Sequence, residues 1–296
     1  GVDVFLFISA FLMTASFVRK GTSFRLVAFL VQRFRPRVPL AALVLATTLA
    51  VGWLVLPPTR YEGLLTHAWA SLLYRENWQL VADAANYMAP DPQRLNPFQH
   101  FWSLSLQGQF FVLLPLLFVG AAALERRSGL SIRRSLAVVL GLATVVSFAW
   151  ASHLVHASPT AAYFDTGARA WEFTAAALVA LLPPLALPPW ASRLLSWSGV
   201  TLLLASGLIW GRGAFPASAA IPPLAAAAMV MIAGNRPDDR WHASWWLARG
   251  PLVFVANRAY ALYLWHWPVY VFALVVTSNS NPHTGWGTSV AVLTVS

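Results

Sequence analysis

The stretch AYALYLWHWPVYVFAL, residues 259–274, decides the class of fold that this chain adopts. It is apolar enough to cross a bilayer as a helix, for which about 20 apolar residues suffice. Yet it carries His266 beside Trp265, with Tyr263 one turn and Tyr260 two turns earlier. An ionisable ring inside lipid needs a partner or a function, because lipid offers no hydrogen bonds. His266 is therefore either a structural histidine bonded to a neighbouring helix or a functional residue.

The composition of the whole chain indicates a polytopic membrane protein. Hydrophobic residues make up 58% of the 296 and charged residues 10%, whereas a soluble domain carries roughly 25% charge. The long continuous apolar runs favour helices over the alternating pattern of a β-barrel. There is no cysteine, which leaves no disulfide, zinc–thiolate site or thiol nucleophile. The 15 tryptophans are typical of aromatic belts at two membrane interfaces.

The apolar runs predict an all-α fold, a single transmembrane helical bundle over residues 1–296. About eight complete spans fit, followed by the start of another. Both ends of the chain fall inside apolar runs, so we expect the bundle to be truncated there. Pro115 and Pro268 lie inside spans, where proline is expected to kink a helix. The predicted spans are residues 2–17, 39–57, 101–122, 135–156, 168–187, 194–211, 219–234 and 252–276, with a partial span at 286–296.

The apolar pattern does not decide whether the amphipathic segment 64–80, which carries His67 and Glu76, crosses the bilayer. If it does not cross the bilayer, the loops on one side hold fourteen basic residues and those on the other side four. Cytoplasmic loops carry the excess of Lys and Arg. We therefore expect residues 58–100 to form an extracytoplasmic loop with an interfacial or re-entrant helix, and the loop 18–38 to face the cytoplasm.

Arginines in the loop before the second span are candidate ligands for an anion. The sequence VQRFRPRVPL places Arg33, Arg35 and Arg37 just inside the membrane boundary. The planar guanidinium fork can hold phosphate with two hydrogen bonds, although the loop could equally be a plain positive-inside anchor. Pro36 argues against one continuous helix through all three. The net charge of +10 lies in such short loops without a nucleic-acid-binding motif, so we expect no nucleic-acid partner.

Charged and polar side chains inside the spans form a second group of candidates. Asp3 lies in the first turn of a span, where an acid is costly unless it is paired with an Arg or orients a catalytic group. Arg169 and Glu172 are three residues apart on one helical face, and they could line a polar path or simply neutralise each other. The span at 101–122 begins with a string of polar residues that we expect to face a substrate: His100, Ser103, Ser105 and Gln107.

Four segments, in the same order, together resemble the acyltransferase 3 family of membrane-bound O-acyltransferases. They are GVDVFLFISAFLMT (1–14), NPFQHFWSLSLQGQFFVLLPLL (96–117), AYFDTGARAWEFTAAALVAL (162–181) and NRAYALYLWHWPVYVF (257–272). The resemblance runs almost from end to end. One departure stands out: the family has a Glu-Glu pair where this chain has Gln107-Gly108, and glutamine cannot serve as a general base.

The resemblance implies a bacterial inner-membrane enzyme that moves an acyl group, often acetyl, from cytoplasmic acyl-CoA to a hydroxyl of a cell-envelope or secreted glycan. Acyl-CoA is then a co-substrate, with no tightly bound cofactor and no metal. The implied partners are the lipid bilayer, acyl-CoA and a carbohydrate acceptor. The family's first span, which carries its proposed catalytic histidine, is expected to precede residue 1, and an SGNH-type hydrolase domain to follow the last span.

These considerations assign three roles and leave two other functions open. A glycan or lipid transporter would be favoured by broken helices in matching halves of the chain, and the Gln107-Gly108 departure permits an inactive binding relative. The predicted catalytic residues are Asp3, His266 and Glu172. The predicted acyl-CoA ligands are Arg33, Arg35 and Arg37, and the predicted substrate-binding residues are His100, Ser103, Ser105, Gln107, Arg169, Tyr260, Tyr263 and Trp265.

Overall fold

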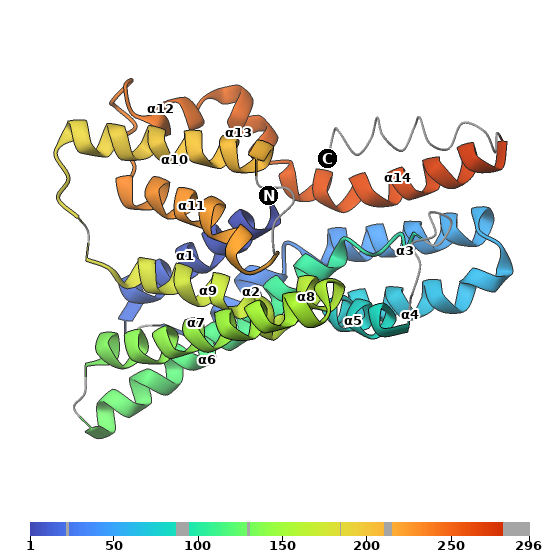
Figure 1. Cartoon of the computed structure of the whole chain (residues 1–296), viewed down its shortest axis with the longest axis horizontal. Coiled ribbons are helices and arrows are strands. Elements are labelled where there is room, and N and C mark those ends of the chain that lie inside the picture. Colours follow the sequence, from blue (N-terminus) through green and yellow to red (C-terminus); the bar gives the residue numbers. More distant parts are fainter. Residues whose placement is uncertain (22–23, 87–94, 129–130, 184, 210–214, 281–296) are drawn as a thin grey trace. The chain divides into compact units, whose positions relative to one another are not determined.

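The computed structural model describes residues 1–21, 24–86, 95–128, 131–183, 185–209 and 215–280, and its regular elements there are all helical (Figure 1). This confirms the predicted fold class. The chain divides into two compact units: unit 1 holds residues 1–30 and 107–255, and unit 2 holds residues 31–106 and 256–296. The partial span predicted at 286–296 lies outside the described residues.

Both units draw on distant parts of the sequence. The boundary between them passes through α2 (Leu26–Phe34) and α6 (Phe101–Ser128). Unit 2 contains α3 (Val38–Val55), η2 (Pro58–Arg60), α4 (Tyr61–Leu72), α5 (Glu76–Asn86) and α14 (Ala259–Ser280). Unit 1 contains α1 (Val2–Lys20), α7 (Ile132–Ala157), α8 (Pro159–Phe164), α9 (Thr166–Leu181), α10 (Pro189–Ile209), η4 (Ser218–Ala220), α11 (Ile221–Ala233), α12 (Ala243–Leu247) and most of α13 (Gly250–Ala256).

Within the described residues, five helices are long and apolar enough to cross a membrane: α1, α3, α6, α7 and α14. The predicted count of eight complete spans is therefore not confirmed. The span expected at 168–187 is the 16-residue α9, and that at 219–234 holds the 13-residue α11. The span expected at 252–276 is broken, since α13 ends at Ala256 and α14 begins at Ala259 after a turn at the polar pair Asn257-Arg258.

In unit 1, α9 packs closely against α1 and α7 because its buried face is built from small residues. Ala168, Ala176 and Ala177 are fully buried there, and small side chains let helix backbones approach. The Phe173 ring stacks on Phe110 of α6 with centroids 3.8 Å apart. The buried face of α9 therefore holds this unit together and also carries the polar residues of the first candidate site.

A glycine sets the contact between α10 and α11. A Cβ atom added to Gly199 would lie 2.8 Å from the backbone oxygen of Ala226 and 2.7 Å from Val230 Cγ2, so only glycine permits this approach. Gly207 and Gly211 have the GxxxG spacing that often marks a close helix contact, yet a Cβ added to Gly207 would meet nothing within 4 Å, and Gly211 lies outside the described residues.

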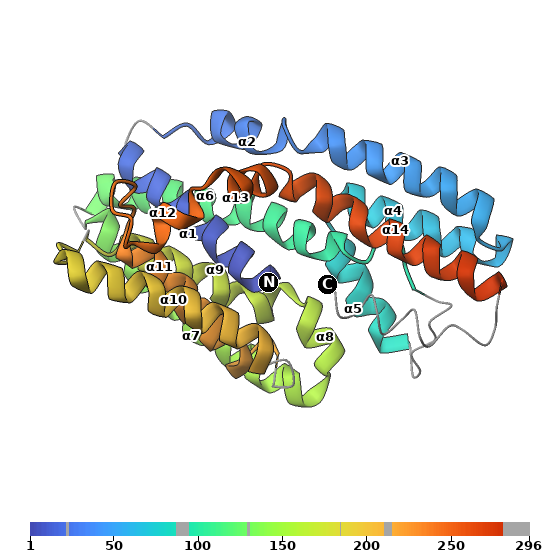
Figure 2. The same ribbon diagram turned by 90° about the horizontal axis from the view of Figure 1, so that it is seen from above.

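In unit 2, α3 and α14 lie side by side and run in the same direction, whereas α4 returns antiparallel to α3 (Figures 1 and 2). The Tyr260 hydroxyl donates to the backbone oxygen of Arg37 over 3.1 Å, which joins the starts of α14 and α3. The Tyr61 hydroxyl donates to Trp53 O over 2.8 Å at the far end of α3.

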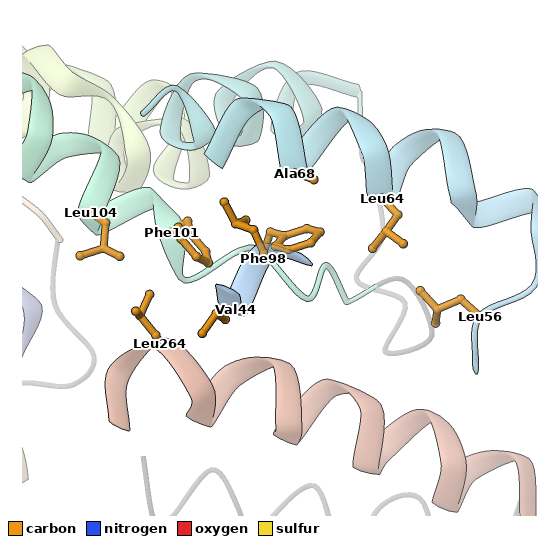
Figure 3. Close-up of a cluster of buried hydrophobic side chains, with 9 residues drawn as sticks. Val44, Leu56, Leu64, Ala68, Phe98, Phe101, Leu104 and Leu264 are labelled. Atoms are coloured by element: carbon orange, nitrogen blue, oxygen red, sulfur yellow. The ribbon is translucent and has the colours of Figure 1, made fainter. Parts of the chain in front are cut away.

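A cluster of buried apolar side chains fills the space between these helices (Figure 3). Val44 from α3, Phe98 before α6 and Leu264 from α14 have no exposed surface. Burial of side chains of this size stabilises a fold by roughly 1.5–3 kcal/mol each relative to water. The complete cluster is Val44, Leu45, Leu56, Leu64, Ala68, Phe98, Phe101, Leu104 and Leu264.

The segment predicted as one helix at 64–80 is two helices in the structure. α4 ends at Leu72 and α5 begins at Glu76, with Tyr74 between them at a φ of 56°. Positive φ is costly for a bulky residue. Tyr74 packs edge-on against Phe34 at the end of α2, with ring centroids 5.4 Å apart, so the break coincides with a tertiary contact. Periodicity alone could not predict this break.

Candidate functional site

A buried cluster of two acids and one arginine lies in unit 1, where α1 meets α9. The Arg169 Nη1 donates to Glu172 Oε1 over 2.7 Å and also to Asp3 Oδ1. Arg169 and Glu172 have no exposed surface, and Asp3 is buried as well. The i,i+3 pair on α9 was predicted from spacing, whereas the pairing with Asp3 joins residues 166 positions apart. We call these three residues the acid–arginine cluster.

Two aromatic rings and a carbonyl fix the guanidinium of this cluster. Arg169 Nε donates to Tyr163 O over 2.9 Å, and its Cζ lies 4.7 Å from the Tyr163 ring centroid and 5.6 Å from that of Phe215. Rings at such distances attract a cation. Glu172 Oε2 is buried and has no hydrogen-bond partner among the described residues. Two carboxylates thus share one arginine, and one carboxylate oxygen is left able to accept a further hydrogen bond.

Polar residues of α6 in unit 1 connect helices. Gln107 Nε2 donates to Ser9 Oγ of α1 over 2.8 Å, and Gln109 Oε1 accepts from Thr166 Oγ1 of α9 over 2.8 Å. Gln107, predicted to bind substrate, therefore already has a partner on a neighbouring helix. A glutamine suits this position because its amide can donate, which a carboxylate in the same place could not do.

A second polar group lies in unit 2, where the start of α6 meets α14. His100 is buried, and its Nε2 donates to Leu264 O over 3.1 Å. The Tyr263 hydroxyl donates to His100 O over 2.6 Å and lies 2.6 Å from Ser103 Oγ. Because that hydroxyl proton is used, Ser103 is the donor to Tyr263. The predicted substrate residues His100, Ser103 and Tyr263 are thus brought together, and they mainly satisfy one another and the backbone.

His266 is the exposed member of this second group. Its Nδ1 lies 2.6 Å from Tyr263 O, one turn back on α14, and its ring centroid lies 5.7 Å from that of His100. Since a carbonyl oxygen only accepts, Nδ1 must carry the proton and Nε2 of the neutral ring is an acceptor. Nε2 has no hydrogen-bond partner within the described residues. Trp265, also predicted to bind substrate, is 36% exposed on α14.

The predicted anion ligands lie where α2 ends and α3 begins. α2 ends at Phe34 and α3 begins at Val38, so Arg35 to Arg37 form a turn, as Pro36 predicted. Arg37 Nη1 donates to Arg33 O over 2.5 Å. Partial burial, and then the charge of Arg37, lower the pKa of Arg33. A second positive charge so close to Arg33 favours the binding of an anion there.

A third polar cluster, none of whose members was predicted to belong to a site except Ser105, joins α4, α5 and the start of α6 in unit 2. Glu76 Oε1 accepts from His67 Nδ1 over 2.9 Å and from Asn96 Nδ2 over 2.8 Å. His67 Nε2 lies 3.1 Å from Asp83 Oδ2, whose other oxygen accepts from Gln79. The backbone N–H of Glu76 donates to Ser105 Oγ over 3.2 Å. This accounts for Ser105, which was predicted to face a substrate.

The protonation of this Glu76–His67 cluster depends on its burial. Burial raises the pKa of Glu76 to about 7, against the lowering effect of His67 and Asn96. For His67, burial lowers the pKa, but the hydrogen bond to Glu76 and the charges of Glu76 and Asp83 outweigh it and raise the pKa. Glu76 has no exposed surface, and its Oε2 lacks a hydrogen-bond partner in the described part of the chain.

The Glu76–His67 cluster predicts that the protein loses stability as the pH rises. Both folded-state pKa values lie above the ordinary ones, so the folded state binds protons more tightly than the unfolded state. The stabilisation is complete below the ordinary carboxyl pKa and is lost as the pH rises to about 7. Glu76→Gln keeps an acceptor for His67 and Asn96 but cannot titrate. In the unchanged protein we expect the free energy of unfolding to decline by on the order of 1–3 kcal/mol between about pH 4.5 and 7.5. In Glu76→Gln this decline should be smaller.

Melting temperature against pH, followed by tryptophan fluorescence in detergent, measures this effect. Glu62→Gln is the matched control, since Glu62 is an exposed carboxylate on the neighbouring α4. Equal pH slopes for the two variants would show that Glu76 does not titrate in this range.

The comparisons with known proteins agree with the motifs. The family model described as an acyltransferase domain matches residues 1–296. A protein named as a membrane-bound transacylase, BcsY of Komagataeibacter xylinus, is 28% identical over 275 residues, which is 92% of this chain and 66% of BcsY. The O-acetyltransferase OatA of Staphylococcus aureus (strain NCTC 8325) is 26% identical over 288 residues, 92% of this chain and 46% of OatA.

One further relative covers nearly the whole chain. The peptidoglycan O-acetyltransferase OatA of Listeria monocytogenes is 23% identical over 299 residues, 96% of this chain and 46% of the relative. The chain thus spans about two thirds of BcsY and just under half of the two OatA proteins. No solved structure matches.

Proposed function

Because the chain belongs to the acyltransferase 3 family, as its motifs predicted, we propose that it transfers an acyl group from acyl-CoA to a hydroxyl of a cell-envelope glycan. The two OatA relatives are named as O-acetyltransferases, one of them of peptidoglycan, and BcsY as a transacylase. These names support an acetyl donor and a polysaccharide acceptor. We place the protein in a bacterial inner membrane, with the bilayer, acyl-CoA and the glycan as partners.

The observation that carries this proposal is the hydrogen bond between the Tyr260 hydroxyl and Arg37 O. It ties the arginine turn to α14, the helix that presents His266. Six residues separate Tyr260 from His266, which is roughly 9 Å along a helix at 1.5 Å per residue. In this proposal the CoA phosphates bind to Arg33, Arg35 and Arg37, at one end of α14. A short distance further along the helix is His266, whose Nε2 is an acceptor in the neutral ring.

We propose that His266 accepts the proton of the acceptor hydroxyl. As the acceptor oxygen attacks, a C–O bond forms to the acyl carbon, and the C–S bond of the thioester breaks. The CoA thiolate leaves and takes the proton back from His266. The hydrogen bond from Nδ1 to Tyr263 O supports this role, because it keeps Nε2 free of a proton in the neutral ring. Such positioning of the tautomer is what acyl-transfer sites obtain from a fixed hydrogen bond.

For the acid–arginine cluster we propose that it binds hydroxyl groups of the acceptor through Glu172, with Asp3 and Arg169 as positioning residues. A buried cluster that contains two acids and one base is costly unless something else compensates the second acid. The unpartnered Glu172 Oε2 supports this proposal, since a sugar hydroxyl could donate to it. Glutamine at 107 is then a helix-joining residue, and the absence of the family's Glu-Glu pair does not require inactivity.

The parallel course of α3 and α14 supports the proposed topology. Two parallel spans require an odd number of crossings between them. The five spans predicted between residues 101 and 234, of which α6 and α7 are long and apolar enough in the described structure, would satisfy this if the segment containing α4 and α5 does not cross. α4 returns along α3 far enough for Tyr74 to reach Phe34, which favours the re-entrant alternative over an interfacial helix for residues 58–100.

The donor site is tested by changing its three arginines. In the full-length protein, Arg33→Gln, Arg35→Gln and Arg37→Gln together are expected to weaken acetyl-CoA binding by at least tenfold. The physical reason is that each charged hydrogen bond lost costs about 1.5–3 kcal/mol. Binding is measured by calorimetry, and turnover by the thiol released from acetyl-CoA with soluble peptidoglycan fragments as acceptor.

The matched control removes three other cations from the same predicted cytoplasmic loop: Arg19→Gln, Lys20→Gln and Arg25→Gln. If both triple variants bind acetyl-CoA equally well, the arginine turn is a topology anchor and the proposed donor site is wrong.

A further inference from the structure

A pocket of about 430 Å³ lies in unit 1, between the end of α1, the end of α6 and the start of α7. Its size lies within the range of about 300–1,000 Å³ that is usual for small-molecule sites. Phe17, Phe118, Leu136 and Leu181 form much of its wall, and the rings of Phe17 and Phe118 stack with centroids 4.3 Å apart. The pocket shares no residue with the acid–arginine cluster, so the chemistry proposed there does not explain it.

Positive charge surrounds this apolar chamber. Arg126 and Arg133 belong to its lining. Arg133 is anchored by a 2.8 Å hydrogen bond from Nε to Leu181 O, whereas Arg126 is exposed in the last turn of α6. Arg19 and Lys20 are exposed in the last turn of α1. The neighbouring acid, Glu125, is bonded to the backbone instead: its Oε1 accepts from the N–H of Ile132 over 3.2 Å.

We propose that this pocket binds one acyl chain of an anionic phospholipid, with the lipid phosphate held at Arg126. An apolar chamber with a cationic mouth is complementary to a ligand with a hydrocarbon tail and a negative head group. Basic pockets between membrane helices on the cytoplasmic side recognise such head groups. The pocket lies where the positive-inside rule places the cytoplasmic face, at the loops 18–38 and 123–134. The pocket shares no residue with the arginine turn to which the donor acyl-CoA is assigned, so the donor of the proposed reaction does not account for it.

Lipid retention by the purified full-length protein tests the site. The protein is exchanged into nanodiscs of phosphatidylcholine that contain a minor fraction of phosphatidylglycerol, and co-purifying lipid is measured by native mass spectrometry. We expect phosphatidylglycerol to be retained selectively. Arg126→Gln should lower its retention roughly fivefold, because a basic residue near an anionic lipid contributes about 1 kcal/mol. Ala122→Trp, which places an indole in the pocket, should abolish retention of the tightly bound lipid.

Two matched controls separate the pocket from general membrane attraction. Arg127→Gln removes the neighbouring exposed charge, which does not line the pocket, and Gly120→Trp adds the same ring at a position with open space. Both should retain lipid like the unchanged protein, and unchanged melting temperatures confirm folding. Equal losses in variant and control, or equal retention of both lipids, would overturn the proposal. So would a photo-crosslinker at position 122 that captures acyl-CoA or another segment of the chain instead of lipid.

Discussion

Acyl transfer is expected to fall by at least about tenfold when His266 is replaced by Gln, and by about 10²–10⁴-fold if this imidazole is the only proton acceptor. Gln places an amide near the position of Nε2, so it retains hydrogen bonding without a titratable nitrogen. The loss should appear in turnover with little change in acetyl-CoA affinity, because the arginine turn remains intact. The measurement is the rate of thiol release from acetyl-CoA by the full-length protein in vesicles.

His266→Asn is the matched partner of this variant. Its shorter amide can replace Nδ1 as the donor to Tyr263 O but leaves nothing at the position of Nε2. A structural histidine should therefore be rescued by Asn and not by Gln, with melting temperature following the same order. A catalytic histidine should be impaired in both variants while both melt normally. Normal turnover in both would assign the proton transfer to another residue.

The largest expected effect on stability comes from Arg169→Met. The side chain has no exposed surface, and removing its charge leaves Asp3 and Glu172 buried without a cation. Removing one partner of a buried ion pair lowers the free energy of unfolding by about 3–5 kcal/mol, which is a large share of the stability of a typical protein. We expect the variant to melt at a much lower temperature, or to be recovered in low yield from the membrane.

A compensated variant distinguishes loss of charge balance from loss of packing. Asp3→Asn and Glu172→Gln added to Arg169→Met leave no charge in the cluster, and this triple variant is expected to regain most of the lost stability. If it melts as low as Arg169→Met, the shape of the arginine between Tyr163 and Phe215 matters more than its charge. Transfer activity should stay low in the triple variant even where its stability is regained, because the Glu172 carboxylate proposed to bind the acceptor is absent.

The apolar pattern predicted the long helices well because each of them is a long continuous apolar run, which favours a helix over the alternating pattern of a β-strand. α1, α3, α6 and α7 begin within a few residues of the predicted spans. The breaks were not predictable in the same way. The turn at Tyr74 depends on its contact with Phe34, forty residues earlier, and Asn257-Arg258 interrupts an otherwise apolar stretch by only two residues. Because hydropathy is averaged over many residues, neither of these two breaks interrupts the apolar pattern.

The candidate residues were predictable individually, but their partners were not. Spacing on one helix predicted the pair Arg169 and Glu172, whereas the third member, Asp3, is 166 residues away from Arg169. Polar residues at the start of α6 were predicted to bind substrate, and in the structure three of them form hydrogen bonds that join helices, namely Ser103, Ser105 and Gln107. The Glu76–His67 cluster was missed because its members lie on either side of the Tyr74 break. The sequence feature that could have indicated this cluster was the glutamate, Glu76, within the amphipathic segment 64–80.

The hydrogen bond between Tyr260 and Arg37 also sets an order of events during synthesis. It joins residues 223 positions apart, and a ribosome that adds 5–20 residues per second needs roughly 10–45 s to cover that distance. During this interval α3 and α4 are in the membrane without α14, and the apolar surface that Leu264 later buries remains uncovered. Unit 2 therefore completes its packing late, when α14 docks against α3. A stalled or truncated nascent chain should be recognised by quality-control proteases through that open surface.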